Sequence, residues 1–306
     1  MAPPTRPRFG SLQFWPRKRA AKFLPRVNWS VVNHDSFGGV VAYKVGMATA
    51  IIRDKTPQSM TANKKIAMPV TILEVPKMKI FSVRFYKNGV VVKEVVVSHD
   101  KELKRKIKTP KAVGNIEHAP EHDEIRVIVY PVMKDMFKKT PDLTEVSFKG
   151  DIEAVKGFIG KEISFKEFFK TQLVDVRGLT KGKGLSGPVA RFGISLRSHK
   201  AEKGVRRPGS LGPWHPARVT YYAPLAGQLG MFTRVHYNLR VVHVGTGSDQ
   251  GIANNGFKNY GLVKNDYLLV SGSVQGPAKR QILITPAMRP SKKMAKKNYE
   301  FMELQR

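Results

Sequence analysis

The amino-acid sequence predicts a mostly β protein with an α+β insertion, in which an antiparallel β-barrel carries long extended segments. Three observations predict this fold class. Short β-branched and aromatic runs, separated by Gly, Pro and Asn, fill the first and last thirds of the chain, a pattern typical of antiparallel barrels. The segment between them opens with mixed helix and strand signals. Two further segments are strongly basic and show neither the helical nor the strand period, so we expect them to be extended.

The composition indicates a globular protein with a polyanionic partner. The chain has 306 residues, of which 41% are apolar, enough for a sizeable core. It carries 54 Lys and Arg against 23 Asp and Glu, a formal net charge of +31. Such self-repulsion destabilises a compact protein unless a polyanion neutralises it, so nucleic acid is the expected partner. The absence of cysteine excludes disulfides and Cys-ligated zinc sites. No long apolar run occurs, and we expect neither a membrane span nor a secretory signal.

Residues 1–37 are predicted to form an extended basic arm. Five prolines within it disfavour a regular helix, and with it the amphipathic helix of a mitochondrial transit peptide. Aromatic residues alternate with the cations, and we expect them to stack on RNA bases or to insert into a groove of the protein. The candidate RNA-binding residues of the arm are Arg6, Arg8, Arg17, Lys18, Arg19, Lys22 and Arg26.

Residues 38–99 and 219–290 are predicted to form the β-barrel core. The runs KIFSVRFY and VVVKEVVV are joined by Lys-Asn-Gly, and Asn-Gly supplies the positive φ that a tight hairpin needs. Closure of the sheet would remove the exposed edges of many short strands. Similar strand-like runs return late in the chain, at 231–245, 266–274 and 280–286.

Residues 100–176 are predicted to be a mixed α/β lobe inserted into the barrel. Segments near 99–108 and 151–160 have helical character, and Ser164 with Glu167 matches a capping box. Acids and bases balance here, which indicates a surface that faces solvent or protein. The C-terminal tail, 291–306, has helical potential and four lysines, and both a solvated helix and a second RNA anchor are open interpretations.

Residues 177–218 form a Gly- and Pro-rich central extension with ten Lys or Arg and one acid, Glu202. Few internal contacts would offset the roughly 1–2 kcal/mol of backbone entropy lost per ordered residue, so order must come from an anionic partner. The glycines would let the backbone approach phosphates closely. The candidate RNA-binding residues here are Arg177, Lys181, Lys183, Arg191, Arg197, His199, Lys200, Lys203, Arg206, Arg207, Trp214, His215 and Arg218.

Motifs that would indicate an enzyme fail on their context. Residues 182–187 match GxGxxG, but Pro188 follows and no long apolar helix comes next, so a dinucleotide fold is rejected. His118, His122, Asp123 and Glu124 resemble a metal cluster, but Pro120 interrupts the helical face that would bring the histidines together. The other histidines show no acid pairing and no serine elbow. We therefore expect no catalytic residue, no metal site and no small-molecule substrate.

Trp214 lies in the string Gly212-Pro213-Trp214-His215-Pro216, in the most hydrophilic part of the chain. With no local apolar face to join, its indole is either inserted into a remote core or displayed to a partner. Display is the favoured interpretation, because stacking on a base stabilises a complex by roughly 1–3 kcal/mol. Flanking prolines would stiffen that presentation.

At these residues the sequence resembles a known family. The strings PRFGSLQFWPRKRA, YKVGMATAIIRD, KGKGLSGPVARFGISLRSHKAEKG and GSLGPWHPARVTYYAPLAGQLGMFTRVHYNLRVVHVG are similar, over essentially the whole chain, to the archaeal form of the ribosomal protein L3 family. The resemblance implies a six-stranded barrel of the translation-factor type and two extensions that penetrate large-subunit rRNA. It also implies an early assembly role near the 3′ end of that RNA, and a tryptophan at the extension tip close to the peptidyl-transferase centre. Trp214 falls in the matching Gly-Pro-Trp-His-Pro motif.

By the same resemblance, the chain is a non-catalytic structural component of the large ribosomal subunit in the cytoplasm. Its partners would be large-subunit rRNA and neighbouring ribosomal proteins, without a membrane. No cofactor is expected, apart from structural Mg²⁺ or K⁺ associated with the rRNA. Glu202 departs from the basic character of the extension, so RNA contacts are less expected there than at Arg206 and Arg207. An RNA-modifying enzyme and a free RNA chaperone are the rival functions.

Overall fold

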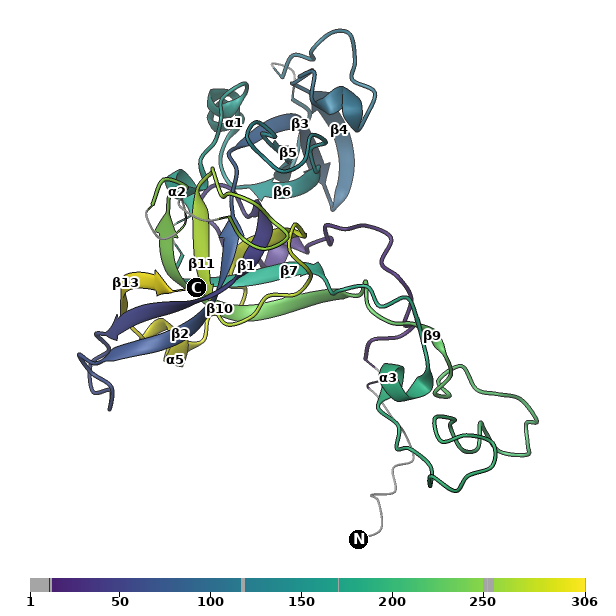
Figure 1. Ribbon diagram of the computed structural model, residues 1–306. Coiled ribbons are helices and arrows are strands. Elements are labelled where there is room, and N and C mark those ends of the chain that lie inside the picture. The colour runs from purple at the N-terminus through teal and green to yellow at the C-terminus, as the bar shows by residue number, and fades with distance from the viewer. Residues whose placement is uncertain are drawn as a thin grey trace. The chain divides into compact units, whose positions relative to one another are not determined.

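The computed structural model describes residues 11, 13–116, 119–169, 171–249, 252 and 256–305. The chain divides into two compact units, each made of two segments. We call Phe23–Gly178 with Arg234–Arg306 the core unit, and Met1–Lys22 with Leu179–Thr233 the basic unit. Figure 1 shows both, with most of their helices and strands labelled.

A seven-stranded antiparallel sheet makes up most of the core unit. Because β12 pairs with both β7 and β1, six of its strands close into a ring, and β13 is added outside the ring on β1. The prediction of a mostly β, antiparallel fold is confirmed. In spatial order the strands are β12 (Gln281–Pro286), β7 (Leu173–Leu179), β10 (Thr233–Gly245), β11 (Tyr267–Ser271), β2 (Lys65–Glu74), β1 (Val40–Asp54) and β13 (Tyr299–Gln305).

A second, four-stranded sheet has the order β4-β3-β5-β6. The predicted hairpin is present, with Asn88 at φ 50° and Gly89 at φ 75° in its turn. It belongs to this second sheet, however, and not to the ring, because β3 pairs with β5 along its other edge. Local sequence identified the hairpin but carried no signal for its long-range partner. The strands are β3 (Met78–Lys87), β4 (Val90–Val96), β5 (Glu124–Pro131) and β6 (Thr144–Phe148).

The helices are short. The segment after Ser98, predicted to be helical, contains only a 3-10 turn. The expected capping box does not form, because the Ser164 hydroxyl donates to Asp266 at 3.4 Å and makes no cap hydrogen bond. No helix among the described residues is long and apolar enough to span a bilayer. The helices are η1 (Trp29–Val31), η2 (Leu103–Arg105), α1 (Ile152–Phe158), α2 (Phe165–Phe168), α3 (Pro188–Phe192) and α5 (Lys292–Ala295).

The C-terminal tail differs from its predicted helical character. After the single turn of α5, the chain becomes β13, which pairs with β1 from Thr49 to Asp54. Phe301 of β13 stacks on His243 of β10 with ring centroids 4.3 Å apart. Tyr299, Phe301 and Leu304 of β13 pack against a buried hydrophobic cluster, whereas Met302 is exposed, so the strand has one covered face.

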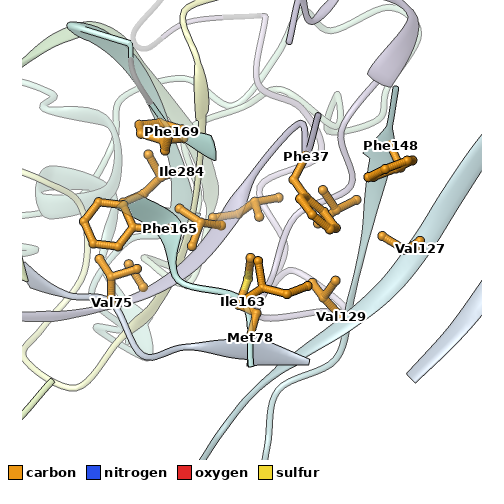
Figure 2. Close-up of a cluster of buried hydrophobic side chains, with 14 of the residues drawn as sticks. Phe37, Val75, Met78, Val127, Val129, Phe148, Ile163, Phe165, Phe169 and Ile284 are labelled. Atoms are coloured by element: carbon orange, nitrogen blue, oxygen red, sulfur yellow. The ribbon is translucent and has the colours of Figure 1, made fainter. Parts of the chain in front are cut away.

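The largest hydrophobic cluster is continuous between the two sheets. Figure 2 shows Ile284 of the ring, Val127 and Val129 of the second sheet, and Phe37, which precedes β1. Phe37 packs against Phe148 with ring centroids 5.0 Å apart. Burial of each such side chain contributes roughly 1.5–3 kcal/mol. This shared core unites the two sheets in one unit.

Candidate nucleic-acid interface

The basic unit is built on a two-stranded stem, which we define as residues 179–187 and 227–233. Backbone hydrogen bonds join its sides, from Thr180 N to Phe232 O at 3.0 Å and from Lys183 N to Leu229 O at 2.9 Å. The short strands β8 (Leu185–Ser186) and β9 (Gly227–Gln228) continue the pairing. The stem extends strands β7 and β10 along the chain and carries α3 and a long irregular loop, 193–226. The predicted extension therefore has a backbone framework of its own.

Gly230 allows the close approach of the stem strands, and Gly227 leaves room for the guanidinium of Arg191. Gly230 has φ +77°, and a Cβ there would lie 1.9 Å from the carbonyl oxygen of Lys181. A Cβ on Gly227 would lie 2.8 Å from the guanidinium of Arg191. A larger residue at either position would force the stem apart or displace that guanidinium.

Arg191 connects three separate segments through backbone carbonyls. Its Nε donates to Gln228 O at 3.0 Å, its Nη1 to Leu225 O at 3.1 Å, and its Nη2 to Arg17 O at 3.1 Å. The Arg17 guanidinium donates in return to the carbonyl of Arg191. Burial lowers the pKa of Arg191, although a guanidinium stays charged at any physiological pH. This reciprocal pair fixes residues 15–20 of the arm to the base of the loop.

Aromatic rings cover the same pair. The rings of Trp15 and Phe192 stack at 5.8 Å with an interplanar angle of 27°, and the Arg17 guanidinium lies 4.3 Å from the centroid of Phe192. Tyr221 contacts Trp15 edge-on at 5.9 Å. Such cation–π contacts stabilise by roughly 0.5–2 kcal/mol. The aromatic residues of the arm were expected either to stack on RNA bases or to insert into a groove of the protein, and Trp15 packs against the protein.

The remaining cations among the described residues of the basic unit are exposed. The unit contains fifteen Lys and Arg, with Glu202 as its one acid. Among its described residues no ion pair is formed, since every ion pair found joins two residues of the core unit. The exposed candidates are Lys18, Arg19, Lys22, Lys181, Lys183, Arg197, His199, Lys200, Lys203, Arg206, Arg207, Trp214, His215 and Arg218.

Several candidates lie elsewhere. Arg177 is in β7 of the core unit and 5% exposed, where its guanidinium donates to the Thr285 hydroxyl and lies 3.9 Å from Asp175. Burial lowers the pKa of Arg177, partly offset by the charge of Asp175. The structure gives Arg177 a structural role within the ring. Arg26 is exposed on the core unit, and Arg6 and Arg8 lie outside the described residues.

Trp214 is 86% exposed, so the indole is displayed and is not inserted into a core. It lies in the irregular loop 193–226, within a bend formed by residues 214–216. An indole this exposed costs solubility, and a partner that covers it would recover the free energy of burying a large aromatic surface.

No enzyme-like site is formed by the expected motif residues. The GxGxxG string leads into α3, which has five residues and begins with Pro188. His122 donates from Nδ1 to the Pro120 carbonyl at 2.8 Å and packs on Phe85, while His118 lies outside the described residues. Within the described ranges, no group of three or more His, Asp or Glu could hold a metal ion.

Sequence reasoning missed the arm-to-loop contacts. Arg17 and Arg191 are 174 positions apart, and both were counted only as phosphate ligands. The sequence alone assigns no role to Phe192, Tyr221 or Gly227. No local periodicity signals such contacts, and the one available signal was the concentration of aromatic residues near arginines at Trp15, Phe192 and Tyr221.

Comparison with known proteins places the chain in the class of ribosomal proteins. The family described as Ribosomal protein L3 matches residues 1–108 and 85–305, and the chain belongs to that family. Large ribosomal subunit protein uL3 of Methanocaldococcus jannaschii is 38% identical over 95% of this chain and 94% of the relative. The protein of the same name from Methanococcus aeolicus is 40% identical over 93% and 92%, and that from Methanothrix thermoacetophila 37% over 97% and 96%. The chain is therefore a structural ribosomal protein of the large subunit and not an enzyme.

Proposed function

We propose that the basic unit is the rRNA-binding element of this protein, and that its arm and loop lie within folded large-subunit rRNA. The observation that carries the proposal is the charge of this unit, fifteen Lys and Arg against Glu202. Glu202 is the one acid that the unit has to offset this charge, and Lys181, Lys183, Arg206 and Arg207 are exposed. A phosphate backbone supplies the missing counter-charge and releases its own counterions on binding.

The irregular backbone of the loop supports RNA rather than a regular DNA groove as the ligand. Loop 193–226 contains no helix or strand, while exposed Trp214 and His215 lie among its cations. Structured RNA offers unstacked bases and irregular phosphate surfaces that such a loop can follow. A regular groove would instead suit a helix or a two-stranded ribbon.

Family membership supports a more detailed proposal. The closed ring of the core unit is a six-stranded barrel of the translation-factor type, and the loop with Trp214 approaches the peptidyl-transferase centre and helps to hold its RNA geometry. The protein binds near the 3′ end of the large-subunit rRNA and nucleates assembly. The segment 100–176, whose charges balance, contacts neighbouring ribosomal proteins.

A salt titration of matched variants tests the proposal. Lys181, Lys183, Lys200 and Lys203 are exposed in the basic unit, and Lys101, Lys104, Lys106 and Lys108 are exposed in the core unit. Each set is replaced by Gln in the full-length chain, and binding to transcribed large-subunit rRNA is measured by filter retention at several salt concentrations. If all four basic-unit lysines contact phosphates, their loss should reduce the slope of log K against log salt by about 3–4. The binding constant near 0.1 M salt should then fall by up to about a thousandfold.

The core-unit set is expected to bind as the wild type does. Equal losses in the two sets would show that net charge, and not the basic unit, controls binding, and would overturn the proposal. Wild-type protein that binds rRNA without a steep salt dependence would overturn it as well.

A further inference from the structure

The loop of the basic unit encloses a cavity of about 550 Å³. Three stretches of chain form its walls, residues 194–197, 207–213 and 220–224. Its size is within the roughly 300–1,000 Å³ that is typical of small-ligand sites. Because Trp214 is not among the lining residues, the cavity is distinct from the displayed indole.

Hydrogen bonds within the loop hold these walls. Arg197 N donates to Val205 O at 3.0 Å, and the Arg197 guanidinium donates to the carbonyl of Pro208, which joins the first wall to the second. Ala223 N donates to Thr220 O at 3.0 Å and closes the turn of the third wall. The first two walls are therefore joined by hydrogen bonds, and the third has a turn of its own.

The lining combines an apolar floor with a cationic rim. Ile194 and Ala223 are buried, and the ring of Tyr222 is 44% exposed beside them. Arg197 and Arg207 supply the charges, and no acid lines the cavity. Such a lining suits a ligand that joins a flat aromatic ring to an anion, as a nucleotide does. The base would pack on the apolar surface, and a guanidinium would bind the phosphate.

We infer that this cavity receives one unstacked nucleotide of the rRNA, its base against Tyr222 and its phosphate at Arg197 or Arg207. The inference rests on the proposed function and names a ligand subsite within it. An apolar side chain of a neighbouring protein would also fit the floor, but it would leave two guanidinium groups without a counter-charge. The nucleotide satisfies both the floor and the rim.

Two opposite changes to the cavity test the inference. Ala223→Phe fills it and Tyr222→Ala removes its ring, whereas Tyr222→Phe keeps the ring and Trp214→Ala alters an exposed aromatic outside it. The full-length variants are bound to transcribed large-subunit rRNA, and nucleotide reactivity is read by dimethyl sulfate and SHAPE probing. Ultraviolet cross-linking followed by mass spectrometry then identifies peptides that carry a single nucleotide.

We expect Ala223→Phe and Tyr222→Ala to raise the reactivity of the same single nucleotide and to remove its cross-link to residues 207–224. Both variants should also raise the Kd for rRNA about tenfold, as expected for the loss of one base stack. Tyr222→Phe should behave as the wild type, and Trp214→Ala should leave that nucleotide protected. Unchanged reactivity and Kd in both cavity variants would overturn the inference while leaving the rRNA-binding function intact. A cross-link from this cavity to a protein neighbour in purified subunits would overturn it too. Failure of the proposed function would be seen separately, as wild-type binding to rRNA that shows no steep salt dependence.

Discussion

The core unit and the basic unit differ in what holds their backbones in place. Every residue of the four clusters of buried apolar side chains belongs to the core unit. The basic unit relies instead on backbone pairing in its stem and on Arg191, which donates to three carbonyls. The hydrogen bonds of one guanidinium thus stabilise the backbone of the basic unit, whereas buried apolar side chains stabilise that of the core unit.

The two units also differ in how their charges are neutralised. In the core unit acids lie beside cations, as Glu94 and Glu145 do around Arg84. The basic unit has a single acid, Glu202, which is exposed. Both units carry an excess of positive charge, +17 in the core unit and +14 in the basic unit, but the basic unit concentrates its charge in 77 residues against 229. The basic unit thus has the higher density of positive charge and one acid to offset it, which a polyanionic partner would neutralise.

The largest expected effect on stability belongs to the shared core. Ile284 is fully buried and lies between β1 and β7, whose Val40 and Val176 are its register partners. Ile284→Ala should lower the free energy of unfolding by about 2–5 kcal/mol, because it leaves a cavity that the two sheets cannot close. Chemical denaturation followed by circular dichroism measures it.

The control for this change lies in the basic unit. Leu185 of β8 is 82% exposed, and Leu185→Ala should change the unfolding free energy by less than about 0.5 kcal/mol. If both variants lost the same stability, the contrast between a packed unit and an open one would be wrong.

A smaller, local effect is expected at Arg191. Arg191→Met removes three charge-assisted hydrogen bonds to carbonyl oxygens. Water can replace part of this bonding because the carbonyls are partly exposed, so we expect the basic unit alone to lose about 1–3 kcal/mol of stability. Hydrogen exchange should rise in 179–233 and stay unchanged in the core unit.

Arg191→Lys separates charge from geometry. An ammonium keeps the charge but cannot span three carbonyls as a planar fork does, so exchange should rise nearly as much as in the Met variant. Full protection in the Lys variant would mean that charge alone, and not the three-way contact, holds the arm to the loop.

The sequence allowed the β class, the hairpin turn and the basic segments to be predicted, because each has a local cause. Asn88 and Gly89 specify their turn through positive φ, and the prolines and cations of 177–218 exclude regular structure by composition alone. The attachment of the hairpin to β5, the strand at the C-terminus and the Arg17–Arg191 pair depend on partners distant in sequence. Burial of Arg177 was missed for a related reason, since a cation at the end of a strand has the same local sequence whether it faces solvent or Thr285.

The smallest expected effect is a pH dependence in a turn of the core unit that needs no partner. Asp54 ends β1 and accepts hydrogen bonds from Thr56, Ser59 and Thr61, at 2.9, 2.8 and 2.6 Å. The bonds from Thr56 and Thr61 contribute most to a pKa that lies well below the usual value for Asp. The loop of the basic unit has no comparable carboxylate.

A depressed pKa means that the ionised carboxylate stabilises the turn above the unfolded value near pH 4, and that this contribution disappears as the pH falls through the lower folded value. Asp54→Asn replaces one acceptor oxygen by an amide that cannot accept from Ser59 and Thr61. Amide exchange of residues 55–64 should therefore be severalfold faster in the variant at pH 6, and the difference from the wild type should narrow as the pH falls below 4. A difference that stayed constant with pH would show that the turn depends on shape alone and not on the charge of Asp54. The contrast between a core unit whose acids lie beside its cations and donors and a basic unit with a single acid would then lose its smallest example.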